Sequence, residues 1–255
     1  MAQRALVTGA SSGIGEEFAK RLAAEGWSVT GVARGEGKLA EGLKALPGSG
    51  HKALGADLST PQGVAIVANE LATNRHQLLV NNAGVGLFGL FDKTPIEKVH
   101  ALTRLSINAV YELAHAYLKD AQSGDALINV SSMMGMMPFP GQAAYSGSKA
   151  FIVAMSESLW FEMKPRGVYV MALCPGVTKT NFIADGGGAE SEVPKAIVGT
   201  VEMVVGVALA ALKKRKLPVV VPGGLNKVFI FSSRVLSRKA MMNMMGGMAP
   251  KSSLK

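Results

Sequence analysis

Residues 4–15 read RALVTGASSGIG, and this stretch decides the fold. Arg4–Thr8 is a short apolar run, which predicts a buried strand. Three glycines follow at once and permit a tight turn (Gly9, Gly13 and Gly15). The residues after the turn, as far as about Glu25, have the periodicity of an amphipathic helix. The stretch therefore predicts a strand, a turn and a helix whose N-terminus favours an anion such as a pyrophosphate.

Short apolar runs and helical patterns alternate along most of the chain. Further strands are expected at residues 28–33, 51–56, 78–80, 126–130, 168–173 and 217–222. The helices between them include one long helical region at 95–118 and one that carries Tyr145 and ends near Pro165. This alternation predicts an α/β fold with one doubly wound parallel sheet flanked by helices. We expect residues 1–224 to form this dinucleotide-binding domain and residues 225–255 to form a C-terminal helical extension.

The composition excludes several other classes of protein. Cys174 is the only cysteine among 255 residues, which excludes intramolecular disulfides and any cysteine-rich metal site. The four histidines (His51, His76, His100 and His115) do not cluster with other ligand types, so we expect packing or surface roles and no metal. The longest apolar runs are about half of the roughly 20 residues that span a bilayer. Because strand-like sequence begins almost at Met1, we expect no targeting peptide and a cytoplasmic location.

The glycine turn and the end of the second strand predict the cofactor. The spacing G-x-x-x-G-x-G differs from the usual dinucleotide fingerprint G-x-G-x-x-G, and an ordinary strand-to-helix turn is the alternative. An acidic residue about 20 positions on would bind a free ribose 2′-hydroxyl, whereas an arginine accommodates a 2′-phosphate. Arg34 stands at that place, and Ser11 and Ser12 could add donors. We therefore predict NADP(H) rather than NAD(H), with a solvated surface role for Arg34 as the alternative.

Residues 143–149, AAYSGSK, place a phenol and an ammonium four residues apart at the start of an expected helix. Tyr145 and Lys149 would then lie on one face, about 5–6 Å apart. A cation at that distance favours a tyrosinate, so we expect the pKa of Tyr145 to lie below its usual value of about 10. The spacing alone also arises by chance. With support from elsewhere in the chain, it predicts a tyrosine that donates and accepts a proton at neutral pH.

Four motifs together resemble those of the short-chain dehydrogenase/reductase family. They are TGASSGIG at 8–15, NNAG at 81–84, Ser132 thirteen residues before Tyr145, and YSGSK at 145–149. The segment CPGVTKT at 174–180 is similar to that family's nicotinamide-side segment. The resemblance implies a Rossmann-like fold, an oxidoreductase activity and a homodimer or homotetramer.

The resemblance also implies roles for individual residues. Tyr145 matches the catalytic acid/base, and Lys149 matches the residue that lowers its pKa and binds the nicotinamide ribose. Ser132 matches the serine that orients the substrate oxygen, and Asn108 matches the asparagine of a water-linked proton path. The expected cofactor site comprises Gly9, Ser11, Ser12, Gly13, Ile14, Gly15, Arg34, Asp57, Leu58, Asn81, Ala83, Gly84, Tyr145, Lys149, Pro175, Gly176, Thr178 and Thr180. In this set Asp57 matches the residue that contacts the adenine, and Thr180 matches a hydroxyl that meets the carboxamide.

These features predict an NADP(H)-dependent carbonyl reductase or alcohol dehydrogenase. The loop at 133–140 is rich in methionine, and it either lines the cleft for a bulky apolar substrate or packs beneath it. Three glycines at 186–188 suggest a flexible lid, and we expect substrate determinants at 133–144 and 181–193. Two other functions stay open: a non-catalytic NADP-binding regulatory or scaffold protein, and a membrane-peripheral lipid-modifying reductase.

The net charge of +9 belongs to the C-terminal part of the chain. Residues 203–255 contain ten lysines and arginines and no aspartate or glutamate, which leaves −1 for residues 1–202. Residues 228–248 have the pattern of one basic amphipathic helix, a type that can lie in a membrane interface. We favour packing on the domain or across a subunit interface over peripheral membrane contact. Because aromatic residues do not alternate with the basic ones, no nucleic-acid partner is expected.

Overall fold

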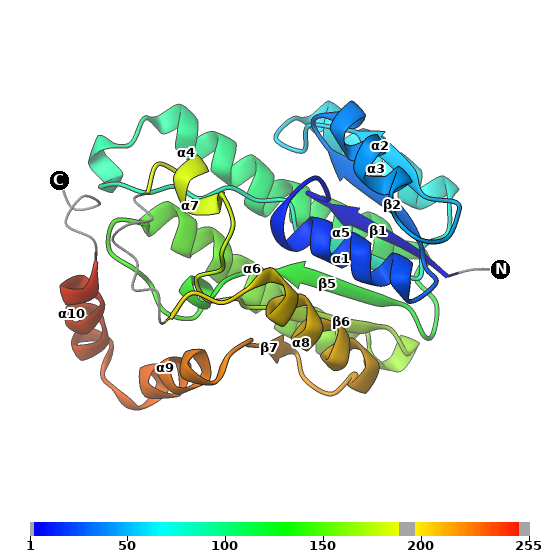
Figure 1. Cartoon of the computed structure of the whole chain (residues 1–255). Coiled ribbons are helices and arrows are strands. Elements are labelled where there is room, and N and C mark those ends of the chain that lie inside the picture. The colour runs from blue at the N-terminus through cyan, green and yellow to red at the C-terminus, as the bar shows by residue number, and fades with distance from the viewer. Residues whose placement is uncertain (1–2, 189–196, 250–255) are drawn as a thin grey trace.

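Seven parallel strands form one sheet in the computed structural model, which describes residues 3–188 and 197–249 (Figure 1). The strand order is β3-β2-β1-β4-β5-β6-β7. The strands are β1 (Arg4–Thr8), β2 (Ser28–Ala33), β3 (Lys52–Gly55), β4 (Leu78–Asn81), β5 (Ala126–Val130), β6 (Tyr169–Leu173) and β7 (Val219–Val220). The order reverses direction between β1 and β4, so a crevice forms beyond the carboxyl ends of these two strands. The Rossmann-like doubly wound fold expected from the sequence is confirmed.

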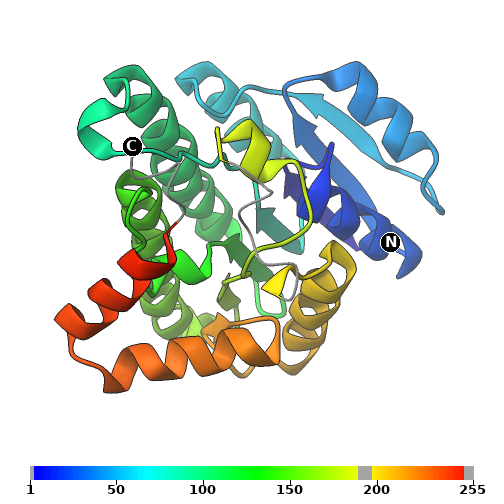
Figure 2. The same cartoon turned by 60° about the vertical axis from the view of Figure 1, so that its left-hand side comes forward.

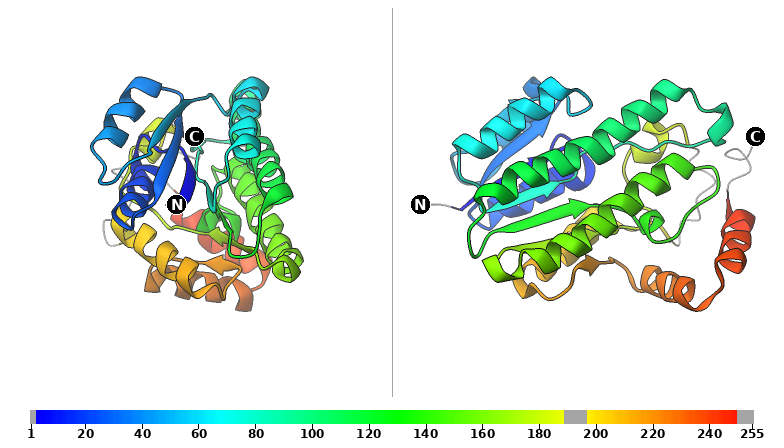
Figure 3. Two further views of the ribbon diagram at one scale, coloured as in Figure 1. Left: turned by 90° about the vertical axis from the view of Figure 1, so that its right-hand side faces the viewer. Right: turned by 180° about the vertical axis from the view of Figure 1, so that it is seen from behind.

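Helices cover both faces of the sheet, as the edge-on view in Figure 3 shows. One core lies between the sheet and α1 (Gly13–Ala24), α2 (Glu36–Lys44) and α8 (Val201–Lys214). The opposite core lies under α3 (Pro61–Thr73), α5 (Ala109–Asp120) and the end of α6 (Ala143–Glu162). The described chain also contains α4 (Ile96–Thr103), α7 (Phe182–Asp185), α9 (Gly224–Val235) and α10 (Arg238–Met248). Among the described residues, no helix combines the length and the apolar character that crossing a membrane requires.

Successive residues of each central strand enter opposite cores. Ala5 and Val7 of β1 belong to the core under α1 and α8, whereas Leu6 between them belongs to the core under α3 and α5. All three side chains are fully buried. A parallel strand covered on both faces reads as a continuous apolar run, which explains the pattern of residues 4–8.

The helical region expected at 95–118 is interrupted. A π-helical turn, Arg104–Asn108, separates α4 from α5. Such turns are rare and are frequently found at functional sites, because they re-aim the side chains around them. The turn packs against α6 and places Asn108 at its last position.

The expectation of a single helix at 228–248 was wrong. The segment forms α9 and α10, which meet at an angle at one edge of the molecule (Figure 2). The helices separate at Leu236 and Ser237, and the Ser237 hydroxyl accepts a hydrogen bond from the backbone N–H of Ala240 at 3.3 Å. A serine that caps a helix N-terminus in this way starts a new helix and does not continue the old one.

Candidate active site

The turn between β1 and α1 requires its glycines. Gly9 and Gly13 have φ angles of +67° and +56°, which side-chain-bearing residues rarely adopt. A Cβ on Gly15 would collide with the carbonyl oxygen of Gly9. The resulting cradle, with the free N–H groups of the first turn of α1 beside it, fits a pyrophosphate. Ser12 is the N-cap of α1 and is exposed, Ser11 is half-buried, and Ile14 packs against the core.

The NNAG segment at the end of β4 holds this turn in place. The Thr8 hydroxyl accepts hydrogen bonds from the backbone N–H groups of Asn82 and Ala83, both at 2.9 Å. The side-chain amide of Asn82 in turn donates to the carbonyl of Thr8 at 2.9 Å. Thr8 and Asn82 were not among the predicted site residues. Their place in two motifs that flank the strand-order switch was the signal that could have identified them.

Asn81 at the end of β4 is buried. Its buried side-chain amide donates to the carbonyl of Val110 at 3.3 Å and to the Oδ1 of Asn129 at 3.0 Å. It therefore ties β4 to β5 and α5. Gly84 lies nearer to the crevice, because a Cβ built on it would be 3.5 Å from the Nζ of Lys149.

Tyr145 and Lys149 occur on the first turns of α6 and are both buried, with exposed fractions of 6% and 4%. The Nζ of Lys149 lies 5.7 Å from the centre of the Tyr145 ring, so the two side chains share one face of the helix, as the spacing of four residues predicts. The same Nζ donates a hydrogen bond to the carbonyl of Val130 at 3.0 Å. The last residue of β5 thus fixes the lysine head group beside the phenol.

The expected direction of the Tyr145 pKa was wrong. Burial raises the pKa of Tyr145 to about 12, and a side-chain hydrogen bond with Ser132 only partly opposes this shift. Burial also lowers the pKa of Lys149 to about 8. Both shifts have one cause, because removal from water penalises the charged form of either group. The phenol is therefore protonated at neutral pH, beside a lysine whose pKa is about 8.

Ser132 and Ser131 follow β5 and have different partners. The Ser132 hydroxyl accepts a hydrogen bond from the backbone N–H of Met134 at 3.2 Å and lies at the Tyr145 phenol. The buried Ser131 hydroxyl donates to the carbonyl of Lys149 at 2.8 Å. Ser132 is therefore the serine beside the phenol, whereas Ser131 anchors α6 to β5. Asn108 lies half-buried on the π-helical turn that packs against α6.

An aromatic side chain covers the tyrosine, and the sequence did not predict it. The ring of Phe182 on α7 lies 5.6 Å from the Tyr145 ring, centre to centre, at an interplanar angle of 59°. The backbone N–H of Phe88 donates to the carbonyl of Gly186 at 3.3 Å, which ties α7 to the loop after β4. At the start of the expected substrate segment, 181–193, Phe182 thus covers Tyr145. Residues 189–193 of that segment lie outside the described part of the chain.

The methionine-rich loop packs against the C-terminal helices. Met137 is buried with Ile230, Met241 and Met245, and the partly buried Met133 and Met136 join the same cluster. These three methionines therefore contribute to the packing between the loop and the C-terminal helices. Asn226 of α9 also lies against Gly176, where a Cβ would be 2.6 Å from its side-chain nitrogen.

The segment after β6 returns to the glycine turn. Pro175 is buried, and its carbonyl accepts a hydrogen bond from the backbone N–H of Met133 at 2.9 Å. The Thr178 hydroxyl donates to the carbonyl of Gly176 at 3.0 Å. A Cβ on Gly13 would lie 3.1 Å from the methyl group of Thr180. Residues far apart in the sequence therefore form one rim of the crevice.

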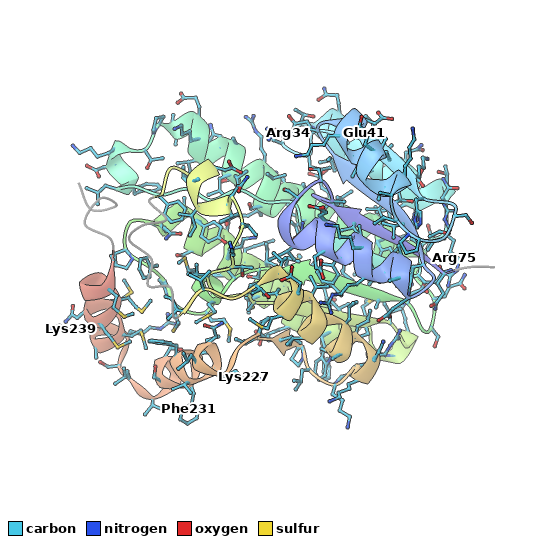
Figure 4. All side chains as sticks on the ribbon, in the orientation of Figure 1. Arg34, Glu41, Arg75, Lys227, Phe231 and Lys239 are labelled. Carbon is cyan, nitrogen blue, oxygen red and sulfur yellow. The ribbon has the colours of Figure 1, made fainter. Side chains whose placement is uncertain are left out.

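The polar groups after β2 and β3 lie at the other end of the crevice. Arg34 is exposed directly after β2, and Figure 4 shows it on the outer side of the fold near α2. The Asp57 carboxylate accepts hydrogen bonds from the N–H and hydroxyl of Ser59, at 2.9 and 2.7 Å. These bonds, and then the charge of Arg34, lower the pKa of Asp57. Leu58 beside it is buried in the core under α3 and α5.

Two of the histidines have the packing roles that the sequence predicted. His76 is buried beside Thr30, whose hydroxyl lies 3.0 Å from its Nε2, and His51 accepts a hydrogen bond from the backbone N–H of Val29 at 3.1 Å. Within residues 3–188 and 197–249, no three histidine, cysteine or acidic side chains converge as a metal site would require.

Comparisons with known proteins agree with this geometry. The family model for short chain dehydrogenases matches residues 3–187. Sulfoacetaldehyde reductase 2 of Chromohalobacter salexigens is 32% identical over 71% of this chain and 75% of its own length. The 7beta-hydroxysteroid dehydrogenase of Mediterraneibacter gnavus is 32% identical over 82% of both chains.

A solved structure extends the similarity to nearly the whole chain. The short-chain dehydrogenase from Sphingobium yanoikuyae in complex with NADPH superposes with a TM-score of 0.82 at 32% identity, over 94% of this chain and 95% of its own. The fold, the family model and these relatives lead to one conclusion. The chain belongs to the short-chain dehydrogenase family of NAD(P)-dependent oxidoreductases.

Proposed function

We propose that this protein uses NADP(H) to reduce the carbonyl group of an apolar substrate, or to oxidise the corresponding secondary alcohol. The observation that carries the proposal is the buried pair of Tyr145 and Lys149, with the lysine Nζ 5.7 Å from the phenol ring and Ser132 beside the phenol. Burial of the lysine lowers its pKa to about 8 and opposes its charged form, so its place beside the phenol supports a chemical role.

The cofactor is NADP(H), and the glycine turn would hold its pyrophosphate. Arg34, an exposed cation at the end of β2, would bind the 2′-phosphate. The Sphingobium relative in complex with NADPH supports this choice. When bound, NADPH supplies the hydride for the carbonyl carbon. Reduction is the proposed direction, because cells usually keep the NADP pool reduced.

The side chains of this chain supply the proton and stabilise the developing charge. Ser132 and Tyr145 hydrogen-bond the substrate oxygen, where negative charge accumulates. Tyr145 donates its proton to that oxygen, since its pKa of about 12 keeps it protonated. Lys149, held by the carbonyl of Val130, and Asn108 on the π-helical turn return a proton to the phenol through water.

Phe182 supports an apolar substrate. Its ring packs on Tyr145 and offers an aromatic surface at the place where the carbonyl must arrive. The steroid substrate in the name of the Mediterraneibacter relative is consistent with such a surface. The methionine-rich loop at 133–140 supports an apolar substrate less strongly, because three of its methionines pack against α9 and α10.

The test is NADPH oxidation with a panel of ketones and aldehydes of increasing size, for the wild type and for Tyr145→Phe. We expect the variant to bind NADPH with unchanged affinity and to lose turnover by about 10²-fold or more. Tyr111→Phe is the matched control, because Tyr111 is an exposed tyrosine on α5 and should retain full activity. Substantial turnover by Tyr145→Phe would refute the acid/base role. Tight NADPH binding without turnover on any substrate would favour a regulatory function.

A further inference from the structure

Helix α9 has two apolar faces, and the domain covers only one of them. On its inner face, Ile230 is buried and Phe229 half-buried in the cluster that contains Met137 and Met241. The opposite face carries large apolar side chains that are exposed to solvent: Leu225, Val228, Phe231 and Val235. Phe231 and Val235 are 69% and 71% exposed. Their spacing of three and four residues places them on one side of the helix.

The exposed face lies on the outside of the molecule. Figure 4 shows Phe231 on the side of α9 that points away from the sheet, with Lys239 on the outer side of α10. From behind, in Figure 3, α9 and α10 project at the edge of the fold. Large side chains exposed together on one helical face mark an interaction surface more often than single exposed residues do. None of the described residues covers this face.

The charge around this face has one sign. Lys227, Arg238 and Lys239 are exposed at its margins, and no acidic residue occurs anywhere between Met203 and Lys255. A two-fold contact uses the same patch on both copies, so these cations would meet a patch that carries the same positive charges. The segment offers no carboxylate to pair with them. The exposed apolar side chains and the surrounding cations of α9 and α10 are together complementary to a surface that accepts apolar groups and carries negative charge.

We propose that the outer face of α9 docks on an anionic lipid surface. Val228, Phe231 and Val235 would enter the boundary between headgroups and acyl chains, while Lys227, Arg238 and Lys239 meet the lipid phosphates. The helix would lie in the plane of the membrane and not cross it. This inference concerns the location of the protein and holds whether or not the proposed reaction is correct.

Vesicle co-sedimentation of the full-length protein tests the proposal. We expect the wild type to pellet with vesicles of phosphatidylglycerol and phosphatidylcholine, and to remain in the supernatant with phosphatidylcholine alone. Val228→Ser with Phe231→Ser should weaken binding by about tenfold or more, because two apolar side chains no longer enter the lipid. Lys227→Glu with Lys239→Glu should abolish binding to the anionic vesicles, because the lipid phosphates then repel the new carboxylates.

Matched controls distinguish binding through this face from nonspecific binding to the vesicles. Phe161→Ser on α6 removes an equally exposed phenylalanine, 69%, and should leave binding unchanged. Lys44→Glu with Lys119→Glu makes the same charge change on α2 and α5 and should retain most of the binding. All substituted side chains are exposed, so thermal unfolding should be close to wild type. Turnover of a water-soluble substrate should also be unchanged in the α9 variants.

Three results would overturn the proposal. The first is pelleting of Val228→Ser with Phe231→Ser at the wild-type level, and the second is no pelleting of the wild type with anionic vesicles. The third comes from light scattering after gel filtration: a smaller assembly for this variant than for the wild type would identify the face as a subunit interface.

Discussion

The Nζ of Lys149 lies 5.7 Å from the Tyr145 ring and is held there by a hydrogen bond to the carbonyl of Val130. The two side chains share one helical face and one buried environment, so burial shifts their pKa values away from their ordinary values in opposite directions. Between pH 8 and pH 12 the pair would hold a neutral phenol beside a neutral amine. Only below about pH 8 does the ammonium accompany the proton donor.

The titration of Lys149 should appear in the pH dependence of catalysis. Because the ammonium form is the one proposed to bind the ribose and assist Tyr145, kcat/KM for NADPH should be flat in acid and fall above about pH 8. This parameter reports the enzyme before the cofactor binds. Steady-state rates at constant ionic strength give the profile. Lys149→Arg, which stays charged, should move the descending limb to higher pH, and an unchanged limb would contradict its assignment to Lys149.

Replacing Lys149 with methionine should stabilise the protein while it removes activity. The lowered pKa corresponds to a destabilisation of the folded protein by about 3 kcal/mol when the lysine is charged. The substitution removes this destabilisation, but it also removes the hydrogen bond to Val130, which stabilises the protein by about 1 kcal/mol. We therefore expect the free energy of unfolding at pH 7 to rise by about 1–2 kcal/mol. Urea unfolding measures it, with Lys119→Met on the surface as the control.

The sign of this effect depends on pH. The folded-state pKa of Lys149 lies below its unfolded value of 10.5, so the unfolded chain binds the extra proton between about pH 8 and pH 10.5. The wild type therefore gains stability relative to Lys149→Met as the pH rises through that window. A stability difference that does not change between about pH 7 and pH 10 would show that the lysine is not buried as described.

Arg34 should determine the choice between the two nicotinamide cofactors. Arg34→Asp should weaken NADPH binding by about 10- to 100-fold, because a charge-assisted contact with the 2′-phosphate is replaced by repulsion. NADH binding should be unchanged or improved. Isothermal titration with both cofactors measures this, and Lys44→Asp on α2 reports the effect of losing an exposed cation elsewhere on the surface. If both variants lose NADPH affinity equally, Arg34 does not bind the 2′-phosphate.

The sequence predicted the parts of the site that local spacing determines. The strands, the glycine turn and the shared helical face of Tyr145 and Lys149 follow from periodicity and helical geometry. The direction in which the pKa of Tyr145 shifts could not be predicted from spacing, because burial depends on what packs over the ring. That cover is Phe182, which reaches Tyr145 from another segment through a contact that spacing does not encode. The π-helical turn at Arg104–Asn108 could not be predicted either, since helical periodicity continues through it into α5.

Gly15 should be the most sensitive glycine of the cofactor turn. A Cβ at this position would collide with the carbonyl oxygen of Gly9 and lie 2.5 Å from the side-chain nitrogen of Asn82, so the turn must open to accept it. We expect Gly15→Ala to lower the free energy of unfolding by about 1–3 kcal/mol and to weaken NADPH binding by about tenfold or more. Gly42→Ala is the matched control, because Gly42 lies within α2 and a Cβ there has no neighbour within 4 Å. That variant should gain about 0.5–1 kcal/mol, since alanine is the better helix former, and should bind NADPH normally. Urea unfolding and cofactor titration of both variants test the pair. Wild-type NADPH affinity in a folded Gly15→Ala protein would show that the turn does not hold the pyrophosphate.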